Sequence, residues 1–141
     1  MHSGNHFTTA IVRLPCKKLV KGITTANLGV PDYDRAVIQH QEYIHALSSC
    51  GLNVIAMEAD EQYPDSVFIE DPAIVTSSIA IITNPGAPSR KGEVKSVGKQ
   101  LYDYCKQVEH IKSPGCLDGG DVMKCGSHFY IGISKRTNYQ Q

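Results

Sequence analysis

The sequence predicts an α/β protein built from repeated ββαβ units. Short runs rich in β-branched residues alternate with segments in which apolar residues recur at helical spacing. A second observation is a recurring order of features: acidic residues, a strand, a tight turn, a second strand, and a loop with Ser and Arg. This order occurs twice with a period of about 47–50 residues, which lies in the range of repeat arrays and propellers.

The first part of the chain is expected to form a strand, a helix and a second strand. Residues 7–12 and 53–57 are apolar, β-branched runs that predict the two strands. Between them, the Pro-Asp pair at residues 31–32 favours a helix start, and Gly51 favours its end. The polar stretch over residues 17–30 is longer than an ordinary connection, which favours a structured loop with a function. The apolar residues of the predicted helix are Val37, Ile38, Tyr43, Ile44 and Leu47.

The next part predicts a complete ββαβ unit. Ser89 is the expected N-cap of its helix, but Glu93 comes one residue too late for a capping box. The turn sequence Asn-Pro-Gly at residues 84–86 ends the strand before it. The expected segments are a strand at 67–69, hairpin strands at 73–76 and 79–83, a helix at 89–106 and a strand at 108–112.

The last part predicts a second hairpin without its helix. Strands are expected at residues 121–125 and 128–132, followed by a polar loop over 134–138. The sequence then ends at Gln141, where the helix of this unit should begin. We therefore expect a structure that stops inside a unit and leaves an apolar face open to self-association.

Charged side chains occupy the same two points of each unit, before the first strand and after the second. Carboxylates suit a guanidinium or ammonium group, and arginines suit a carboxylate, so together they fit an α-amino acid with a cationic side chain. Taken singly, each of these motifs is more typical of a solvated turn or a surface charge. The candidate residues are Asp65, Glu70, Asp71, Asp118, Asp121, Arg90 and Arg136.

Composition excludes several classes of function. The 14 basic residues balance the 14 acidic ones, which argues against a nucleic-acid-binding protein. No apolar run is long enough to cross a membrane, and the polar start over residues 1–6 is unlike a signal peptide. The five cysteines are an odd number without a C-x-x-C pair, which predicts reduced thiols in a cytoplasmic protein. Their spacing relative to the histidines matches no common zinc pattern.

Several motifs together closely resemble dimethylarginine dimethylaminohydrolase, a family of the pentein superfamily. They are PDSVFIEDP at residues 64–72, TNPGAPSR at 83–90, LDGGDV at 117–122 and FYIGISKRTN at 129–138. The segments at 19–25 and 29–33 fit as well, so that the resemblance covers nearly the whole chain. It implies a five-bladed α/β propeller, of which residues 1–141 are a partial amidinotransferase-type domain: the N-terminal half, with about two and a half repeats.

The resemblance also implies roles in binding a methylated arginine, with no cofactor, no metal and no nucleic-acid or membrane partner. Asp71, with Glu70 beside it, would hold the substrate guanidinium. Asp118 would help to bind it and would support the catalytic histidine. Arg90 and Arg136 would bind the α-carboxylate. Asp65 and the backbone carbonyl of Ile23, on a mobile lid over residues 17–30, would meet the α-amine.

In this family a cysteine thiolate attacks the guanidinium carbon and a histidine acts as general acid and base, giving citrulline and a methylamine. None of the cysteines and histidines of this chain matches those motifs, and Cys116, although near Asp118, lacks the setting of a nucleophile. We therefore expect the parent protein to be a hydrolase and this chain alone to be inactive. Two alternatives are an arginine deiminase-like pentein and an inactive fragment that only binds ligands or partners.

Overall fold

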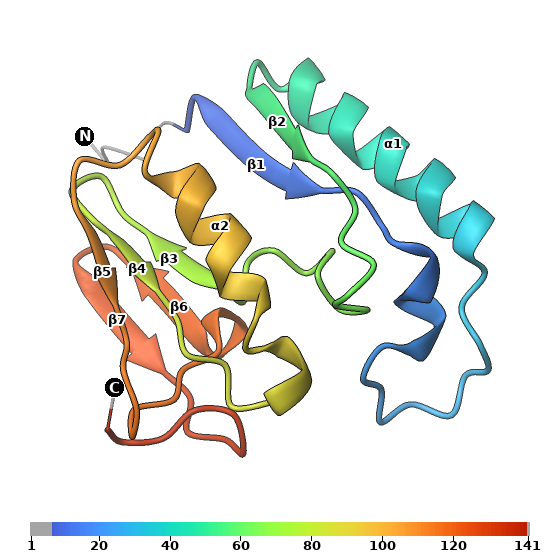
Figure 1. Ribbon diagram of the computed structural model, residues 1–141. Coiled ribbons are helices and arrows are strands. Elements are labelled where there is room, and N and C mark those ends of the chain that lie inside the picture. Colours follow the sequence, from blue (N-terminus) through green and yellow to red (C-terminus); the bar gives the residue numbers. More distant parts are fainter. Residues whose placement is uncertain (1–6, 141) are drawn as a thin grey trace. The chain divides into compact units, whose positions relative to one another are not determined.

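The computed structural model describes residues 7–140, so the predicted polar start at residues 1–6 lies outside the described part. The chain divides into two compact units, Met1–Val67 and Phe68–Gln141. Both combine helices with small sheets, as expected for an α/β protein (Figure 1).

The first unit is the predicted strand–helix–strand. Strand β1 (Thr9–Arg13) pairs in parallel with β2 (Asn53–Met57), and the connection between them contains the 3₁₀ helix η1 (Lys17–Lys21) and helix α1 (Tyr33–Ser49). The Asp32 carboxylate caps α1 by accepting a hydrogen bond of 3.0 Å from the Arg35 N–H, as the Pro-Asp signal indicated. Gly51 follows the helix with φ of +84°, a conformation that favours glycine.

Helix α1 packs on β2 through only part of its predicted apolar stripe. Val37, Ile44 and Leu47 are half-buried, whereas Ile38 and Tyr43 are exposed. The outcome follows from helical geometry: at about 3.6 residues per turn, positions 37 and 44 lie within about 20° of each other around the axis, whereas position 38 is turned about 100° to one side and position 43 about 120° to the other.

The second unit begins with the predicted ββαβ order. Strands β3 (Ala73–Val75) and β4 (Ala80–Ile82) form an antiparallel hairpin, and β5 (Val108–His110) joins β4 in parallel after helix α2 (Glu93–Leu101). Helix α2 covers β3 and β4 (Figure 1). The core of this arrangement consists of Ala80, Ile82, Val97 and Leu101, each at most 4% exposed.

Two predictions for this region are wrong. Residues 67–69 form turns instead of a strand. The predicted helix at 89–106 is shorter, because Pro88–Arg90 forms the 3₁₀ helix η2 and the N-cap of α2 is Gly92, not Ser89. The physical reason is local: the Arg90 N–H donates to the Ala87 carbonyl at 3.0 Å and the Lys91 N–H to the Pro88 carbonyl at 3.4 Å, and these i→i+3 hydrogen bonds make the tighter 3₁₀ turn.

The second hairpin is also present. After the 3₁₀ helix η3 (Gly119–Asp121), strand β6 (Val122–Cys125) pairs antiparallel with β7 (His128–Ile131). The two hairpin regions are joined by a bridge between Asn84 and Leu117, in which the Leu117 N–H donates to the Asn84 carbonyl at 3.0 Å. Within residues 7–140, no helix has both the length and the apolar character that a membrane crossing needs.

Candidate functional site

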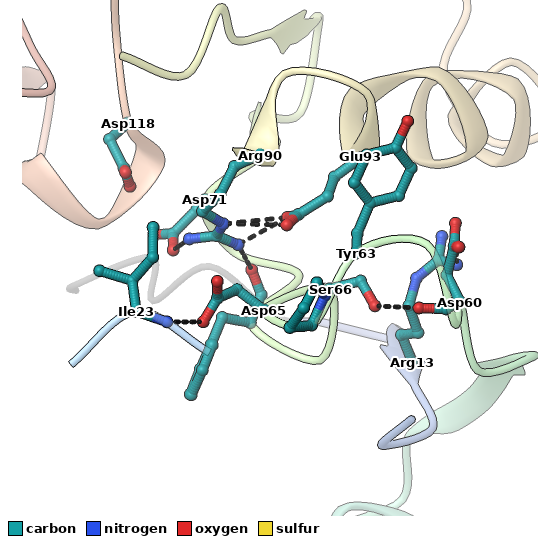
Figure 2. A network of polar contacts seen from close by, with 12 residues as sticks. Arg13, Ile23, Asp60, Tyr63, Asp65, Ser66, Asp71, Arg90, Glu93 and Asp118 are labelled. Atoms are coloured by element: carbon teal, nitrogen blue, oxygen red, sulfur yellow. Dashed lines mark hydrogen bonds and ion pairs between the residues drawn. The ribbon is translucent and has the colours of Figure 1, made fainter. Parts of the chain in front are cut away.

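A buried network of charges lies at the start of α2, in the second unit. The Arg90 guanidinium contacts the carboxylate of Asp71 and, on another side, the carboxylate of Glu93, with the Arg90 Nη2 to Glu93 Oε2 distance 2.7 Å (Figure 2). Arg90 also donates from Nη2 to the Phe68 carbonyl at 3.1 Å. Arg90 and Glu93 are 4% and 2% exposed. Burial alone would lower the pKa of Arg90, but Glu93 and Asp71 outweigh it and raise that pKa, so the guanidinium stays charged.

Asp71 belongs to a pair of carboxylates from the two repeats. Its Oδ1 accepts the Gly120 N–H at 2.9 Å, and the same N–H lies 3.3 Å from Oδ1 of Asp118. Burial would raise the pKa of Asp71, but hydrogen bonding with Asp118 and the contact with Arg90 outweigh it and lower that pKa. Asp71 is therefore the more acidic member of the pair.

Asp118 has the higher pKa of the two carboxyl groups. It is fully buried, and burial together with the facing Asp71 carboxylate raises its pKa to about 6. Oδ2 of Asp118 lies 3.3 Å from Nη1 of Arg136, an ion-pair distance, yet this oxygen accepts no hydrogen bond from the described residues. A buried carboxylate oxygen without a donor is costly, and it is a site that a ligand N–H can satisfy.

The backbone around this pair is closely packed. The Gly119 N–H donates to the Asp71 carbonyl at 2.9 Å, and a Cβ atom on Gly119 would collide with the carbonyl oxygen of Glu70. The Asp118 N–H donates to Oγ1 of Thr137 at 3.1 Å, and Thr137 in turn donates to Oδ2 of Asp121 at 2.6 Å. These contacts explain why the Leu-Asp-Gly-Gly-Asp segment has glycine where the chain passes beside Asp71.

Arg136 differs from Arg90 in its exposure. Its side chain is 48% exposed, and its Nη2 lies 3.8 Å from Oδ1 of Asp121 in addition to the contact with Asp118. Half of this guanidinium therefore faces solvent, where it is accessible to an anionic group of a ligand. Glu70, by contrast, has an exposed side chain.

In the first unit, Asp65 and Ile23 lie together. Asp65 is 5% exposed, and its Oδ1 accepts the Ile23 N–H at 2.9 Å (Figure 2). The contact between the two residues uses the Ile23 N–H, and the role predicted for the Ile23 carbonyl, to meet a substrate α-amine beside Asp65, stays a prediction. The Ile23 side chain is 59% exposed on the segment after η1.

Sequence reasoning missed Glu93, which it considered only as a helix cap. A signal was present, because Glu93 follows Arg90 by three residues, a spacing that brings oppositely charged side chains together at a helix start. Burial of both side chains could not be foreseen from that spacing. Among residues 7–140, no three His, Cys, Asp or Glu side chains gather as a metal site, and the five cysteines are free thiols.

Comparison with known proteins extends these findings. The family model described as eukaryotic N,N dimethylarginine dimethylhydrolase matches residues 31–141. N(G),N(G)-dimethylarginine dimethylaminohydrolase from Pseudomonas aeruginosa is 47% identical over 133 residues, which are 94% of this chain and 52% of that protein. The protein of the same name from Streptomyces coelicolor is 37% identical, over 92% of this chain and 50% of its own length. The chain thus spans about half the length of these curated relatives.

Solved structures agree with the sequence relatives. A mutant of the Pseudomonas aeruginosa dimethylarginine dimethylaminohydrolase complexed with citrulline matches with a TM-score of 0.93 and 46% identity, over 95% of this chain and 53% of that one. The N-terminal domain of ArgZ, a cyanobacterial arginine dihydrolase, matches with a TM-score of 0.80 at 16% identity, over 92% of this chain and 50% of that one. The second likeness shows a shared mixed α/β fold.

Proposed function

The chain belongs to the dimethylarginine dimethylaminohydrolase family, and from this premise we propose that it supplies substrate-binding groups for the hydrolysis of N-omega-methylated arginine to citrulline and a methylamine. The observation that carries the proposal is the buried pair of Asp71 and Asp118, one ionised and one with a pKa raised to about 6. The carboxylate oxygens of this pair can accept hydrogen bonds from the N–H groups along one edge of a planar, cationic guanidinium.

The pair can adapt its charge to the ligand. A guanidinium that approaches Asp71 and Asp118 favours the ionised form of Asp118 and lowers its pKa, because opposite charges stabilise each other. The oxygen of Asp118 that lacks a donor gains one from the ligand. Near and below pH 6, where part of Asp118 is protonated, binding of the guanidinium is therefore coupled to release of a proton, which a neutral ligand does not induce.

The remaining groups are proposed to bind the amino-acid end of the substrate. Arg136 is half-exposed and able to contact an α-carboxylate. Arg90 is proposed to bind the same α-carboxylate of the substrate. To do so, it must give up one of its present contacts, with Asp71 or with Glu93. Asp65 and Ile23 in the first unit are proposed to contact the α-amine, and Glu70 is proposed to assist Asp71.

The proposed reaction needs groups that we assign to the other half of the family's length. A cysteine thiolate there forms a bond to the guanidinium carbon, and the methylamine leaves with a proton from a histidine. Water then attacks the thiouronium carbon, which releases citrulline and restores the thiolate. Asp118 is proposed to support that histidine, and this chain alone is proposed to be inactive.

A chimeric enzyme tests the proposal. The chain would be fused to the half of the Pseudomonas aeruginosa relative that it does not match, and citrulline formation would be measured with dimethylarginine and with arginine. We expect turnover of dimethylarginine by the chimera and none by the 141-residue chain. Turnover of arginine instead would favour the deiminase alternative, and absence of both turnover and ligand binding in a folded chimera would favour the inactive fragment.

A matched pair of variants makes the test specific. Asp71→Asn in the chimera is expected to lower kcat/KM at least about a hundredfold, because a charge-assisted contact to the guanidinium is lost. Asp103→Asn makes the same chemical change at an exposed position just after α2 and is expected to leave kcat/KM unchanged. Equal effects of the two variants would contradict the proposed role of Asp71.

A further inference from the structure

Glu93 has no role in the proposed binding of substrate, yet it is among the most buried charged groups of the described chain. Its Oε1 lies 3.1 Å from Nε of Arg90, and its Oε2 lies 2.7 Å from Nη2 (Figure 2). Two parallel contacts of this kind hold a guanidinium by one edge and fix the orientation of its plane. The Nη1 atom on the other side of the same guanidinium contacts Oδ2 of Asp71.

We propose that Glu93 is a positioning residue for guanidinium binding: by holding Arg90 through its Nε edge, it keeps Arg90 from neutralising Asp71 and leaves that carboxylate available to the ligand. The inference rests on the proposed function, since it assigns Asp71 to the substrate. Arg90 carries one positive charge and is shared between two carboxylates. Glu93 therefore competes with Asp71 for Arg90, and Arg90 competes with the ligand for Asp71.

The start of α2 adds to the hold of Glu93 on Arg90. Glu93 is the first residue of the helix, where the N-terminal N–H groups stabilise a negative charge. The N-cap Gly92 contributes no side-chain oxygen that would compete for this position. The Glu93 carboxylate thus remains paired with Arg90 when Asp71 turns to a ligand.

Within the second unit, the carboxylate pair faces two arginines. Asp71 faces Arg90 and Asp118, and Asp118 faces Arg136. Asp121 lies on the far side of Arg136. Replacement of Glu93 by Gln removes one negative charge from this group without shortening the side chain. Arg90 then interacts more strongly with Asp71, and the site repels a cation more than before.

Two ligands of different charge provide the first test. Binding of dimethylarginine, a cation at its guanidinium, and of citrulline, neutral at its ureido group, would be measured by calorimetry on the full 141-residue chain. In Glu93→Gln, we expect affinity for dimethylarginine to fall about tenfold and affinity for citrulline to change less than about twofold. A loss of packing alone would weaken both ligands equally, and that outcome would overturn the proposal.

A ligand-free measurement separates this inference from the proposed function. The titration midpoint of the Asp118 carboxyl carbon would be followed by NMR, together with the Nε–H signal of Arg90. In Glu93→Gln we expect the Asp118 midpoint to fall below its wild-type value near 6, because Arg90 is pulled towards the pair. The Arg90 Nε–H signal should also lose its protection from exchange. An unchanged midpoint and signal overturn the proposal, whether or not the chain binds dimethylarginine.

Two further variants complete the design. Glu93→Asp keeps the negative charge on a shorter side chain, so we expect its changes in the Asp118 titration midpoint and in dimethylarginine affinity to have the same sign but a smaller size. If Glu93→Gln does not fold, Glu93→Asp takes its place in both measurements. Glu109→Gln makes the identical chemical change on β5, where the side chain is exposed. It should leave both titration and binding unchanged, and an effect as large as that of Glu93→Gln would count against the proposal.

Discussion

The two hairpin regions of the second unit each place an arginine on the aspartate that precedes the hairpin, but with opposite results. Arg90 is 5% exposed at its side chain and contacts Asp71, whose pKa is lowered. Arg136 is 48% exposed and lies 3.3 Å from Asp118, whose pKa is raised to about 6. One sequence pattern therefore produces a fixed anion in the first hairpin region and a titrating acid in the second.

The difference comes from what covers each arginine. Helix α2 begins at Glu93 and packs on β3 and β4, so Arg90 is enclosed and held by a second carboxylate. Within residues 7–140, no helix covers the β6–β7 hairpin in the same way. Arg136 stays in water, where its field is screened, and it cannot offset the burial of Asp118. Burial of the arginine, and not the sequence motif, therefore determines which carboxyl group has the lowered pKa.

The largest expected effect separates the two arginines. Arg90→Met leaves two buried carboxylates without their cation and should lower the free energy of unfolding by about 3–5 kcal/mol. Arg136→Met should lower it by less than about 1 kcal/mol, because the side chain is half-exposed and solvent screens its charge. Urea unfolding of both variants at pH 7 measures the difference. Equal losses would show that exposure does not distinguish the pairs.

A second variant breaks the contact between the two hairpin regions. Gly119→Ala forces a Cβ atom against the backbone carbonyls of Glu70 and Asp71 and should cost about 3 kcal/mol, since backbone atoms cannot move aside as a side chain does. Gly98→Ala in α2 is the control, because its Cβ would meet Ile82 at 3.6 Å, an ordinary contact, and alanine favours the helix. Thermal unfolding should show opposite shifts, and a stable Gly119→Ala variant would contradict the close approach.

The third prediction concerns pH. The folded-state pKa of Asp118, about 6, lies above its usual 3.8, so the folded protein holds the proton more tightly and loses stability as pH rises from about 4 to about 6. Asp118→Asn removes this loss. The free energy of unfolding of the variant minus that of the wild type should therefore increase by about 2–3 kcal/mol between pH 4 and pH 7. Urea titrations across that range measure it, and a pH-independent difference would show that Asp118 does not titrate in this window.

Much of the fold follows from local signals in the sequence. The Pro-Asp start of α1 and Gly51 at its end predicted that helix closely, since capping and left-handed backbone are local properties. Both hairpins were predicted because alternating apolar runs flank short turns. The helix start at Ser89 was wrong because residues 88–90 form a 3₁₀ turn, and the α-helix begins only after Gly92.

The candidate site shows the same division. Its aspartates and arginines were recognised from repeat positions and from a family resemblance, and the structure brings Asp71, Arg90, Asp118 and Arg136 into two ion pairs. Glu93 was missed because it occurs in one repeat only and therefore adds nothing to the recurring pattern. The opposite pKa shifts of Asp71 and Asp118 depend on burial and on the charged groups that face them in the folded chain, which cannot be derived from sequence spacing.

The smallest expected effect on stability tests the hairpins themselves. Met123 and Tyr130 are directly opposite each other on β6 and β7 and are 60% and 55% exposed, so this face remains free for the predicted self-association. The double variant Met123→Thr, Tyr130→Thr should change the free energy of unfolding by less than about 0.5 kcal/mol. It should also reduce oligomer formation in sedimentation experiments. Val75→Thr, at a 52% exposed position on β3 of the covered hairpin, should leave oligomer formation as it is. If wild type and double variant are both monomeric, the exposed face of β6 and β7 does not drive association.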